Sequence, residues 1–199
     1  MPIDTFDFEI SKDDIVIAAD AGILNTKKLN ITPDFIIGDF DSLGYVPSDS
    51  STIVHPVEKD DTDTILAVKL GLSKGYKSFR IFGGLGGRLD HTYANIQTAA
   101  HIAENGGNAL FFGNKENLTV LKNSQIRFTK DNKGNISIFA LEDCENVNIK
   151  GTYYELENGT LSADFPLGVS NKFNNKDVTI SVENGKLLII WERQDKVNG

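Results

Sequence analysis

Two aspartates, Asp39 and Asp41, lie two residues apart directly after a short apolar run, Phe35-Ile36-Ile37. The run is bounded by a proline turn and by Gly38, which predicts a short buried strand that ends in a sharp bend. In an extended segment both carboxylates would lie on one side of the chain, and Phe40 would point into the core. Neighbouring carboxylates repel each other unless a cation lies between them, and Mg²⁺ prefers such oxygen ligands. A loop of solvated, turn-forming aspartates is the alternative, and the spacing alone does not decide between the two.

A second acidic stretch, residues 58–63, precedes apolar residues that recur at helical spacing as far as Gly75. Asp61 or Thr62 is placed to cap the start of this helix. Asp63 would then lie in the first turn, near the positive end of the helix dipole. These carboxylates have two interpretations: ordinary residues of a helix N-terminus, which is the commoner use, or a third acid for a metal site.

Four glycines in five residues, Gly83, Gly84, Gly86 and Gly87, follow the apolar run 78–82 and precede a helical pattern over 93–103. A strand, a glycine loop and a helix present backbone N–H groups to phosphate. The spacing matches neither a Walker loop nor the dinucleotide fingerprint. A generic glycine turn is the alternative, but the next residues, Arg88 and Asp90, favour phosphate binding because a guanidinium offers a fork of donors.

The composition is that of a soluble globular protein, with 199 residues, 40% hydrophobic and 24% charged. A net charge of −8 argues against nucleic acid as the main partner, because binding to its backbone needs clustered Lys and Arg. No run of about 18 apolar residues predicts a membrane span, and no leader resembles a signal peptide. The single cysteine, Cys144, excludes an intrachain disulfide framework. We therefore expect a cytoplasmic protein without membrane or nucleic-acid partners.

The elements that must position these residues fall into two groups. Strand and helix patterns alternate as far as residue 122, which predicts an α/β domain over 1–122 with a Rossmann-like parallel sheet. Short strand-like runs follow, and they predict an antiparallel sandwich or small barrel over 123–199. Asn158-Gly159 and Asn184-Gly185 are hairpin signals within this second domain. The single tryptophan, Trp191, is expected to pack in a core or an interface.

Five motifs occur in a fixed order along nearly the whole chain. They are Asp20-Ala21-Gly22; Pro33-Asp34 with Gly38-Asp39-Phe40-Asp41-Ser42; Lys59-Asp60-Asp61-Thr62-Asp63; Gly83-Gly84-Leu85-Gly86-Gly87-Arg88-Leu89-Asp90-His91; and Gly168-Val169-Ser170-Asn171. Each motif is weak alone, but the ordered set resembles the thiamine pyrophosphokinase family.

The resemblance implies transfer of a diphosphoryl group from ATP to the hydroxyl of thiamine, which gives thiamine diphosphate and AMP. It also implies an α/β catalytic domain followed by a β-sandwich, with Mg²⁺ as cofactor. The family forms homodimers that hold thiamine between the catalytic domain of one subunit and the sandwich of the other. Members usually begin with a further strand and a glycine-containing turn, and here Met1-Pro2 stands where that turn should end.

The resemblance also implies roles for individual residues. The metal-binding and catalytic acids are Asp39, Asp41 and Asp63, and Asp63 is the first choice for accepting the hydroxyl proton. The ATP and phosphate ligands are Lys59, Thr62, Gly83, Gly84, Gly86, Gly87, Arg88 and Asp90. The thiamine side comprises Asp20, Ser170, Asn171 and Trp191.

Three other interpretations stay open at this point. An Asp-x-Asp pair at a strand end also suits other metal-dependent nucleotidyl or glycosyl transferases. A protein that binds ATP and Mg²⁺ without catalysis is a second possibility. The C-terminal domain could also serve only for dimerisation.

Overall fold

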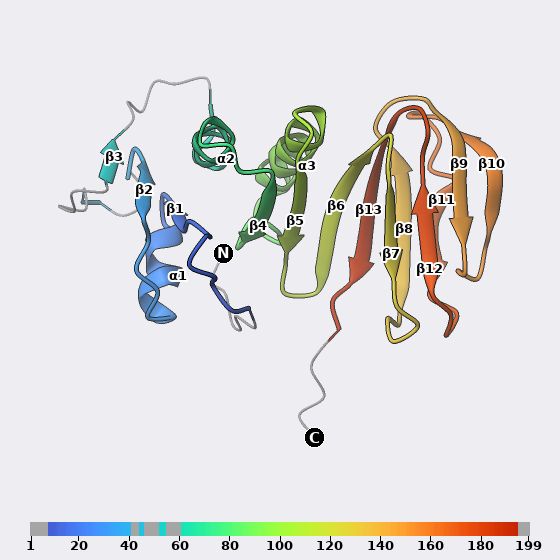
Figure 1. The fold of residues 1–199 in the computed structure, drawn as a ribbon, viewed down its shortest axis with the longest axis horizontal. Coiled ribbons are helices and arrows are strands. Elements are labelled where there is room, and N and C mark those ends of the chain that lie inside the picture. The colour runs from blue at the N-terminus through green and yellow to red at the C-terminus, as the bar shows by residue number, and fades with distance from the viewer. Residues whose placement is uncertain (1–7, 41–43, 46–51, 55–60, 195–199) are drawn as a thin grey trace. The chain divides into compact units, whose positions relative to one another are not determined.

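The computed structural model describes residues 8–40, 44–45, 52–54 and 61–194, and Figure 1 shows the path of the chain through them. Asp41 and Lys59 therefore lie outside the described residues. The chain divides into two compact units, Met1–Tyr76 and Lys77–Gly199. None of the helices that the structure describes is both long enough and apolar enough to span a bilayer.

The first unit contains a parallel three-stranded sheet in the order β1-β2-β3 (Figure 1). Its strands are β1 (Ile17–Ala19), β2 (Phe35–Gly38) and β3 (Thr52–Val54). Its helices are α1 (Gly22–Lys28) and α2 (Asp63–Ser73), and α2 packs against β1 and β2. The predicted parallel pairing is confirmed, since β1 and β2 run in the same direction. The connection that contains α1 returns the chain to the start of β2, as a parallel pair requires.

A small core beneath this sheet fixes the end of β2. Ala18, Ile23, Ile36 and Phe40 form one buried cluster, and Phe40 is only 2% exposed. The prediction that Phe40 points into the core is confirmed. Its backbone has a φ of +61°, a left-handed conformation that is uncommon for a bulky residue. Burial of the aromatic ring stabilises this backbone conformation at Phe40.

The second unit contains a six-stranded sheet in the order β11-β8-β13-β6-β5-β4 and a four-stranded sheet in the order β10-β9-β12-β7. The first four strands along the chain are β4 (Ser78–Phe82), β5 (Asn108–Phe112), β6 (Glu116–Lys122) and β7 (Gln125–Phe128). The remaining strands are β8 (Asn135–Ala140), β9 (Cys144–Lys150), β10 (Leu156–Leu161), β11 (Gly168–Lys172), β12 (Val178–Ser181) and β13 (Lys186–Glu192).

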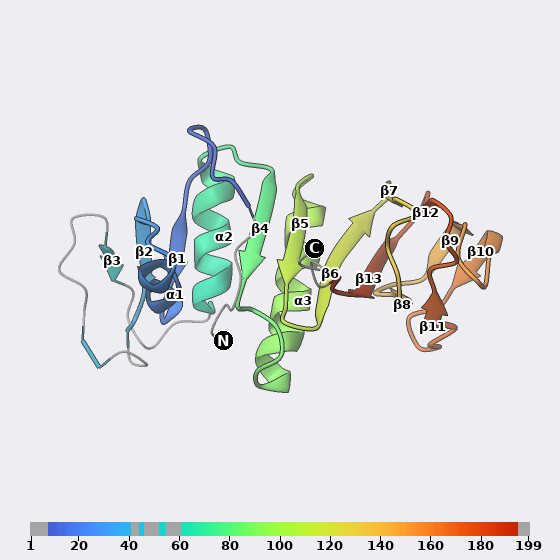
Figure 2. The same ribbon diagram turned by 90° about the horizontal axis from the view of Figure 1, so that it is seen from below.

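One helix of the second unit, α3 (Leu89–Glu104), packs along β5 and β6, as Figure 2 shows. β4 and β5 are parallel, whereas β5 and β6 are antiparallel. The connection between β5 and β6 is only three residues long, which requires an antiparallel pair. Antiparallel pairing therefore begins before residue 122, and β4 and β5 belong to the same sheet as β8, β11 and β13.

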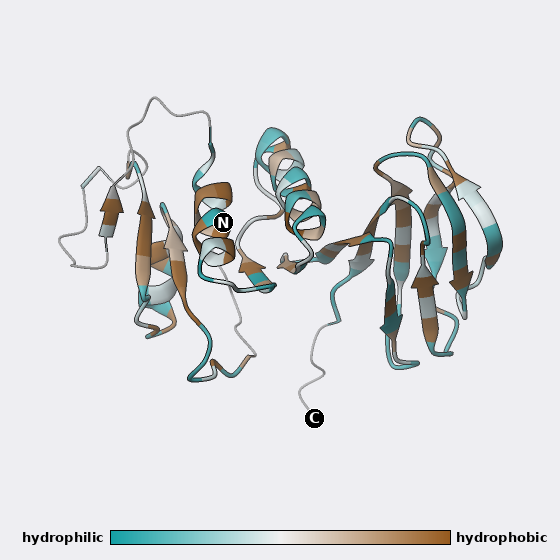
Figure 3. Cartoon of the chain, turned by 45° about the horizontal axis from the view of Figure 1, so that its top comes forward, coloured by the Kyte–Doolittle hydropathy of each residue, from teal (hydrophilic) through white to brown (hydrophobic). Residues whose placement is uncertain are grey.

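The main core of the second unit draws residues from both of its sheets. Ile138, Leu187 and Ile189 come from the six-stranded sheet, and Val147 and Ile180 come from the four-stranded sheet; all five are fully buried. Figure 3 shows the corresponding alternation of hydrophobic and polar residues along these strands. This period of two is what a sheet with one buried face requires.

The two hairpin predictions are wrong. Asn158 and Gly159 lie within β10, where the register with β9 shifts, and Asn158 has a φ of +46°. The left-handed conformation that Asn-Gly favours thus serves a β-bulge rather than a turn. Asn184 and Gly185 lie in the connection from β12 to β13, but these two strands belong to different sheets, and Asn184 bridges to Glu145 instead.

Candidate active site

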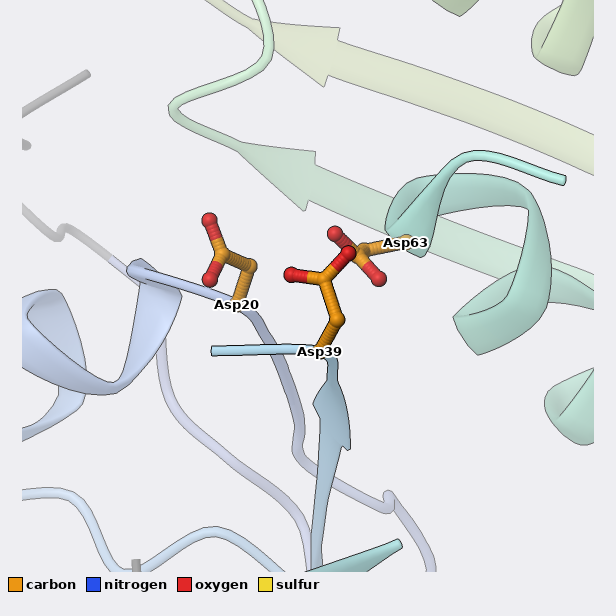
Figure 4. A group of neighbouring side chains, drawn as sticks. All are labelled: Asp20, Asp39 and Asp63. Carbon is orange, nitrogen blue, oxygen red and sulfur yellow. The ribbon is translucent and has the colours of Figure 1, made fainter. Parts of the chain in front are cut away.

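Three carboxylates gather at one end of the parallel sheet of the first unit (Figure 4). Asp20, Asp39 and Asp63 each offer one oxygen, and these oxygens all lie within 4.8 Å of one another. All three side chains are half-buried. They come from three separate segments of the chain, so the cluster depends on how those segments are held together.

Asp20 and Asp39 follow the carboxyl ends of two adjacent parallel strands. The register pairs Ala19 with Ile37, and the N–H of Asp20 donates to the carbonyl of Ile37 at 2.7 Å. Ligands of open α/β sheets bind outside these strand ends. The pairing that builds the sheet therefore also brings the first two carboxylates together.

Gly38 allows the two strand ends to approach closely. A Cβ at this position would lie 3.1 Å from Cα of Asp20 and 3.4 Å from Cε1 of Phe40. Asp20 itself has a φ of +46°, so both segments that carry a carboxylate turn sharply here. Backbone conformations of this kind cost free energy and cluster at functional sites.

Asp63 is the first residue of α2, and a hydrogen bond fixes the start of that helix. The hydroxyl of Thr62 accepts the N–H of Ile65 at 3.4 Å, which confirms Thr62 as the cap. The neighbouring Asp61 forms an ion pair with Lys69 at 2.6 Å and is not part of the cluster. The two interpretations of this acidic stretch therefore meet at Asp63, which lies in the first turn of α2 and also joins the other two acids. Asp61 pairs with Lys69 outside the cluster.

The donor set of the cluster suits a hard divalent cation. Three carboxylate oxygens at this spacing carry like charges that repel one another, and Mg²⁺ and Ca²⁺ both prefer oxygen ligands. The residues present thus fit the metal that the sequence predicts. Asp20, which we expected on the thiamine side, lies in this cluster with Asp39 and Asp63.

The glycine loop of the second unit is held from below by a buried amide. Nδ2 of Asn95, on α3, donates to the carbonyl of Gly84 at 2.7 Å. A Cβ on Gly84 would lie 3.1 Å from that nitrogen, so glycine gives this contact the room that a side chain would narrow. Gly83 and Gly86 have φ values of +76° and +81°. Asn95 is not among the residues predicted from the sequence, although an amide on the apolar face of the predicted helix was a signal for it.

Arg88 and Asp90, at the end of this loop, bind each other. Nε and Nη2 of Arg88 donate to the two carboxylate oxygens of Asp90 at 3.2 and 2.6 Å. This bidentate hydrogen bonding lowers the pKa of Asp90 and raises the pKa of Arg88. Both side chains are exposed. A phosphate that approaches Arg88 would therefore compete with Asp90 for the same donors.

The predicted thiamine-side residues occupy two different environments. Ser170 is exposed at a bulge in β11, with a φ of +59°. Asn171 is buried and makes hydrogen bonds within the unit. Trp191 is 8% exposed and packs edge-on against Phe128, with ring centroids 5.1 Å apart. The expectation that Trp191 packs in a core is confirmed.

Two family models match the chain. Residues 6–111 match the thiamin pyrophosphokinase catalytic domain, and residues 123–187 match the thiamin pyrophosphokinase vitamin B1 binding domain. The chain belongs to the thiamin pyrophosphokinase family. The first match includes the carboxylate cluster and the glycine loop, and the second includes Ser170 and Asn171.

Individual relatives agree with this assignment. The chain is 28% identical over 182 residues to thiamine pyrophosphokinase of Bacillus subtilis, covering 87% of this chain and 85% of the relative. The crystal structure of the Bacillus subtilis enzyme superposes with a TM-score of 0.82 at 24% identity, covering 94% of this chain and 91% of that one. Thiamin pyrophosphokinase from Candida albicans has a TM-score of 0.74 at 18% identity, covering 92% of this chain and 82% of that one. These structures share the mixed α/β fold, with its parallel and antiparallel sheets.

Proposed function

We propose that this chain is a thiamine pyrophosphokinase, which transfers the diphosphoryl group of ATP to the hydroxyl of thiamine. The products are thiamine diphosphate and AMP. The cluster of Asp20, Asp39 and Asp63, within the segment that matches the family's catalytic domain, is the observation that carries the proposal.

The reaction needs the thiamine hydroxyl to attack the β-phosphorus of ATP in line with the departing AMP. Such transfers depend on positioning and on neutralisation of phosphate charge more than on covalent help from the protein. Asp20, Asp39 and Asp63 would hold Mg²⁺, together with Asp41. When bound there, Mg²⁺ supplies the charge that neutralises the transferring phosphates.

The other residues bind and orient. Backbone N–H groups of the glycine loop, Gly83–Gly87, and the guanidinium of Arg88 would bind phosphate oxygens. Lys59 and Thr62 would add further phosphate contacts. Asp63 is the proposed acceptor of the hydroxyl proton.

We also propose two domains for this chain. The parallel pairs β1–β2, β2–β3 and β4–β5, with their helices, support a Rossmann-like domain over 1–122. The antiparallel strands of the two sheets that share one core support a β-sandwich over 123–199. We also propose that the protein is a cytoplasmic homodimer that binds thiamine with its C-terminal domain.

Product analysis tests the reaction. The chain is incubated with ATP, Mg²⁺ and thiamine, and the nucleotide and thiamine products are separated. We expect equal amounts of AMP and thiamine diphosphate, and none of either without thiamine. Release of ADP or pyrophosphate would indicate a different transferase. Binding of ATP and Mg²⁺ without any product would indicate a non-catalytic nucleotide-binding protein.

A further inference from the structure

The side chain of Asn171 uses all of its hydrogen-bonding capacity inside the second unit. Its Oδ1 accepts the N–H of Tyr154 at 3.0 Å and the N–H of Lys172 at 2.8 Å. Its Nδ2 donates to the carbonyl of Tyr154 at 2.7 Å and to the hydroxyl of Thr152 at 3.2 Å. An amide side chain has two lone pairs and two N–H groups, and all four are engaged. The residue is 4% exposed, which leaves no donor or acceptor for a ligand.

These bonds attach the connection between β9 and β10, two strands of the four-stranded sheet, to β11, a strand of the six-stranded sheet. Tyr153 strengthens the attachment, because its N–H donates to the carbonyl of Lys172 at 2.9 Å. The buried hydroxyl of Thr152 donates to the carbonyl of Tyr154 at 2.8 Å. Both backbone groups of Tyr154 are therefore held by side chains. Asn171 supplies the bonds that reach from one sheet to the other.

The attachment holds the backbone that carries two exposed aromatic rings. The side chains of Tyr153 and Tyr154 are 64% and 65% exposed, and their rings meet edge to face with centroids 5.0 Å apart. They lie next to Ser170, because their backbone bonds reach the two residues that follow it. Trp191 and Phe173, by contrast, pack their rings against the core.

We propose that Asn171 is a positioning residue, which acts on thiamine binding through Tyr153 and Tyr154 and does not contact thiamine itself. The inference rests on the proposed function. Thiamine carries a cationic ring and an aminopyrimidine ring, and both suit the face or edge of a tyrosine. Two rings fixed in one geometry lose less side-chain entropy on binding than two mobile rings do.

A double-mutant cycle tests whether Asn171 acts through the tyrosines. Steady-state kinetics are measured for Asn171→Ala, for the pair Tyr153→Ala with Tyr154→Ala, and for all three changes together. We expect each of the first two variants to raise the thiamine KM about tenfold, with the ATP KM and kcat nearly unchanged. The triple variant should match the tyrosine pair, because residues that act as one unit are not additive. A triple variant whose KM rises about a hundredfold would show a direct contact and overturn the proposal.

Two further variants separate positioning from loss of fold. Asn171→Asp keeps the acceptor for Tyr154 and Lys172 but removes the donors, so we expect a thiamine KM between those of wild type and Asn171→Ala. Tyr153→Phe with Tyr154→Phe keeps both rings, and we expect a KM within about twofold of wild type. A wild-type KM in Asn171→Asp, or a tenfold rise in the phenylalanine pair, would contradict the proposal.

Hydrogen exchange and calorimetry give readouts that do not need turnover. The Tyr154 amide should exchange faster in Asn171→Ala than in wild type, while the amides of β12 keep their protection. Calorimetry with thiamine should show the same non-additive loss of affinity as the KM values. A wild-type chain that releases no AMP but shows this pattern in calorimetry would reject only the proposed reaction. An active chain with additive effects would reject only the role of Asn171.

Discussion

The carboxylate cluster of the first unit and the Asn171 region of the second unit use polar residues in opposite ways. In the cluster, the backbone does the positioning, and the motif residues Asp20, Asp39 and Asp63 are themselves the half-buried groups that we propose to hold Mg²⁺. In the Asn171 region, the motif residue is buried, and the exposed groups are its neighbours Tyr153 and Tyr154. Under our two proposals, the aspartates act on a ligand directly, whereas Asn171 acts through the backbone that it holds. Burial and hydrogen-bond partners distinguish the two cases.

The largest expected effect comes from changing a carboxylate of the cluster, which we propose acts directly on the metal. Asp39→Asn should lower kcat at least about a hundredfold, because it removes a negative charge that would hold the Mg²⁺ needed to neutralise the transferring phosphates. The measurement is AMP release at saturating ATP, Mg²⁺ and thiamine. Asp61→Asn is the matched control, since Asp61 is a nearby carboxylate that pairs with Lys69 outside the cluster. Near-normal turnover of Asp39→Asn would remove Asp39 from the metal site.

Addition of Mg²⁺ tests the same cluster without turnover. Binding to the folded state should raise Tm, since a ligand of the native state stabilises it in proportion to the logarithm of its concentration. The rise should be much smaller in Asp39→Asn and unchanged in Asp61→Asn. Equal shifts in all three proteins would place the Mg²⁺ elsewhere.

Gly38→Ala tests whether the backbone positions the carboxylates. The added Cβ would meet Cα of Asp20 at 3.1 Å, so the two strand ends must move apart. We expect a loss of about 1–3 kcal/mol in the free energy of unfolding, together with reduced turnover. Gly22→Ala is the control for stability, because a Cβ there meets no atom within 4 Å at the start of α1. Full activity of Gly38→Ala would show that close approach of the strands is not needed.

Thr62→Ala should have a smaller effect, through the start of α2. Loss of the cap to the N–H of Ile65 should cost about 1 kcal/mol of stability, which denaturant unfolding can measure. Thr62→Ser keeps the hydroxyl and should retain most of that stability. If the alanine and serine variants are equally destabilised, the methyl group of Thr62 rather than its hydrogen bond is what stabilises the helix.

Glu104 is a carboxylate paired with two lysines, in contrast to the mutually repelling acids of the cluster. Its contribution to the free energy of unfolding should depend on pH. Hydrogen bonds from Lys122 and Lys186 lower its pKa below the ordinary value. A depressed pKa contributes stability that is present above the unfolded value of about 4.3 and is lost as pH falls through the folded value. Glu104→Gln should therefore be less stable than wild type at pH 7, and the difference should shrink below pH about 4. A constant difference across this range would mean that the charge does not matter.

The sequence predicted features that depend on neighbouring residues and missed those that depend on distant ones. The short strand before Asp39, the burial of Phe40 and the Thr62 cap all follow from local pattern, and the structure confirms them. Asn158-Gly159 has a turn sequence, but pairing with β9 makes it a bulge.

The two buried asparagines show the same limit more clearly. Asn95 bonds to Gly84, eleven residues away, and Asn171 bonds to Tyr154, seventeen residues away. Neither partner can be identified from spacing, because the distance in space is set by how the sheets pack. The motif identified Asn171 as a candidate residue. Its burial and the hydrogen bonds of its side-chain amide could be seen only in the structure.

The bulge at Ser170 has a further consequence, for how copies of this chain can meet. β11 is the last strand of the six-stranded sheet, and such an edge invites another chain to extend the sheet and aggregate. The left-handed Ser170 and the register shift beside it interrupt the regular row of N–H and C=O groups along this edge. A strand from a second copy would meet this interruption and lose part of its regular pairing. The bulge therefore discourages uncontrolled extension of the sheet at β11.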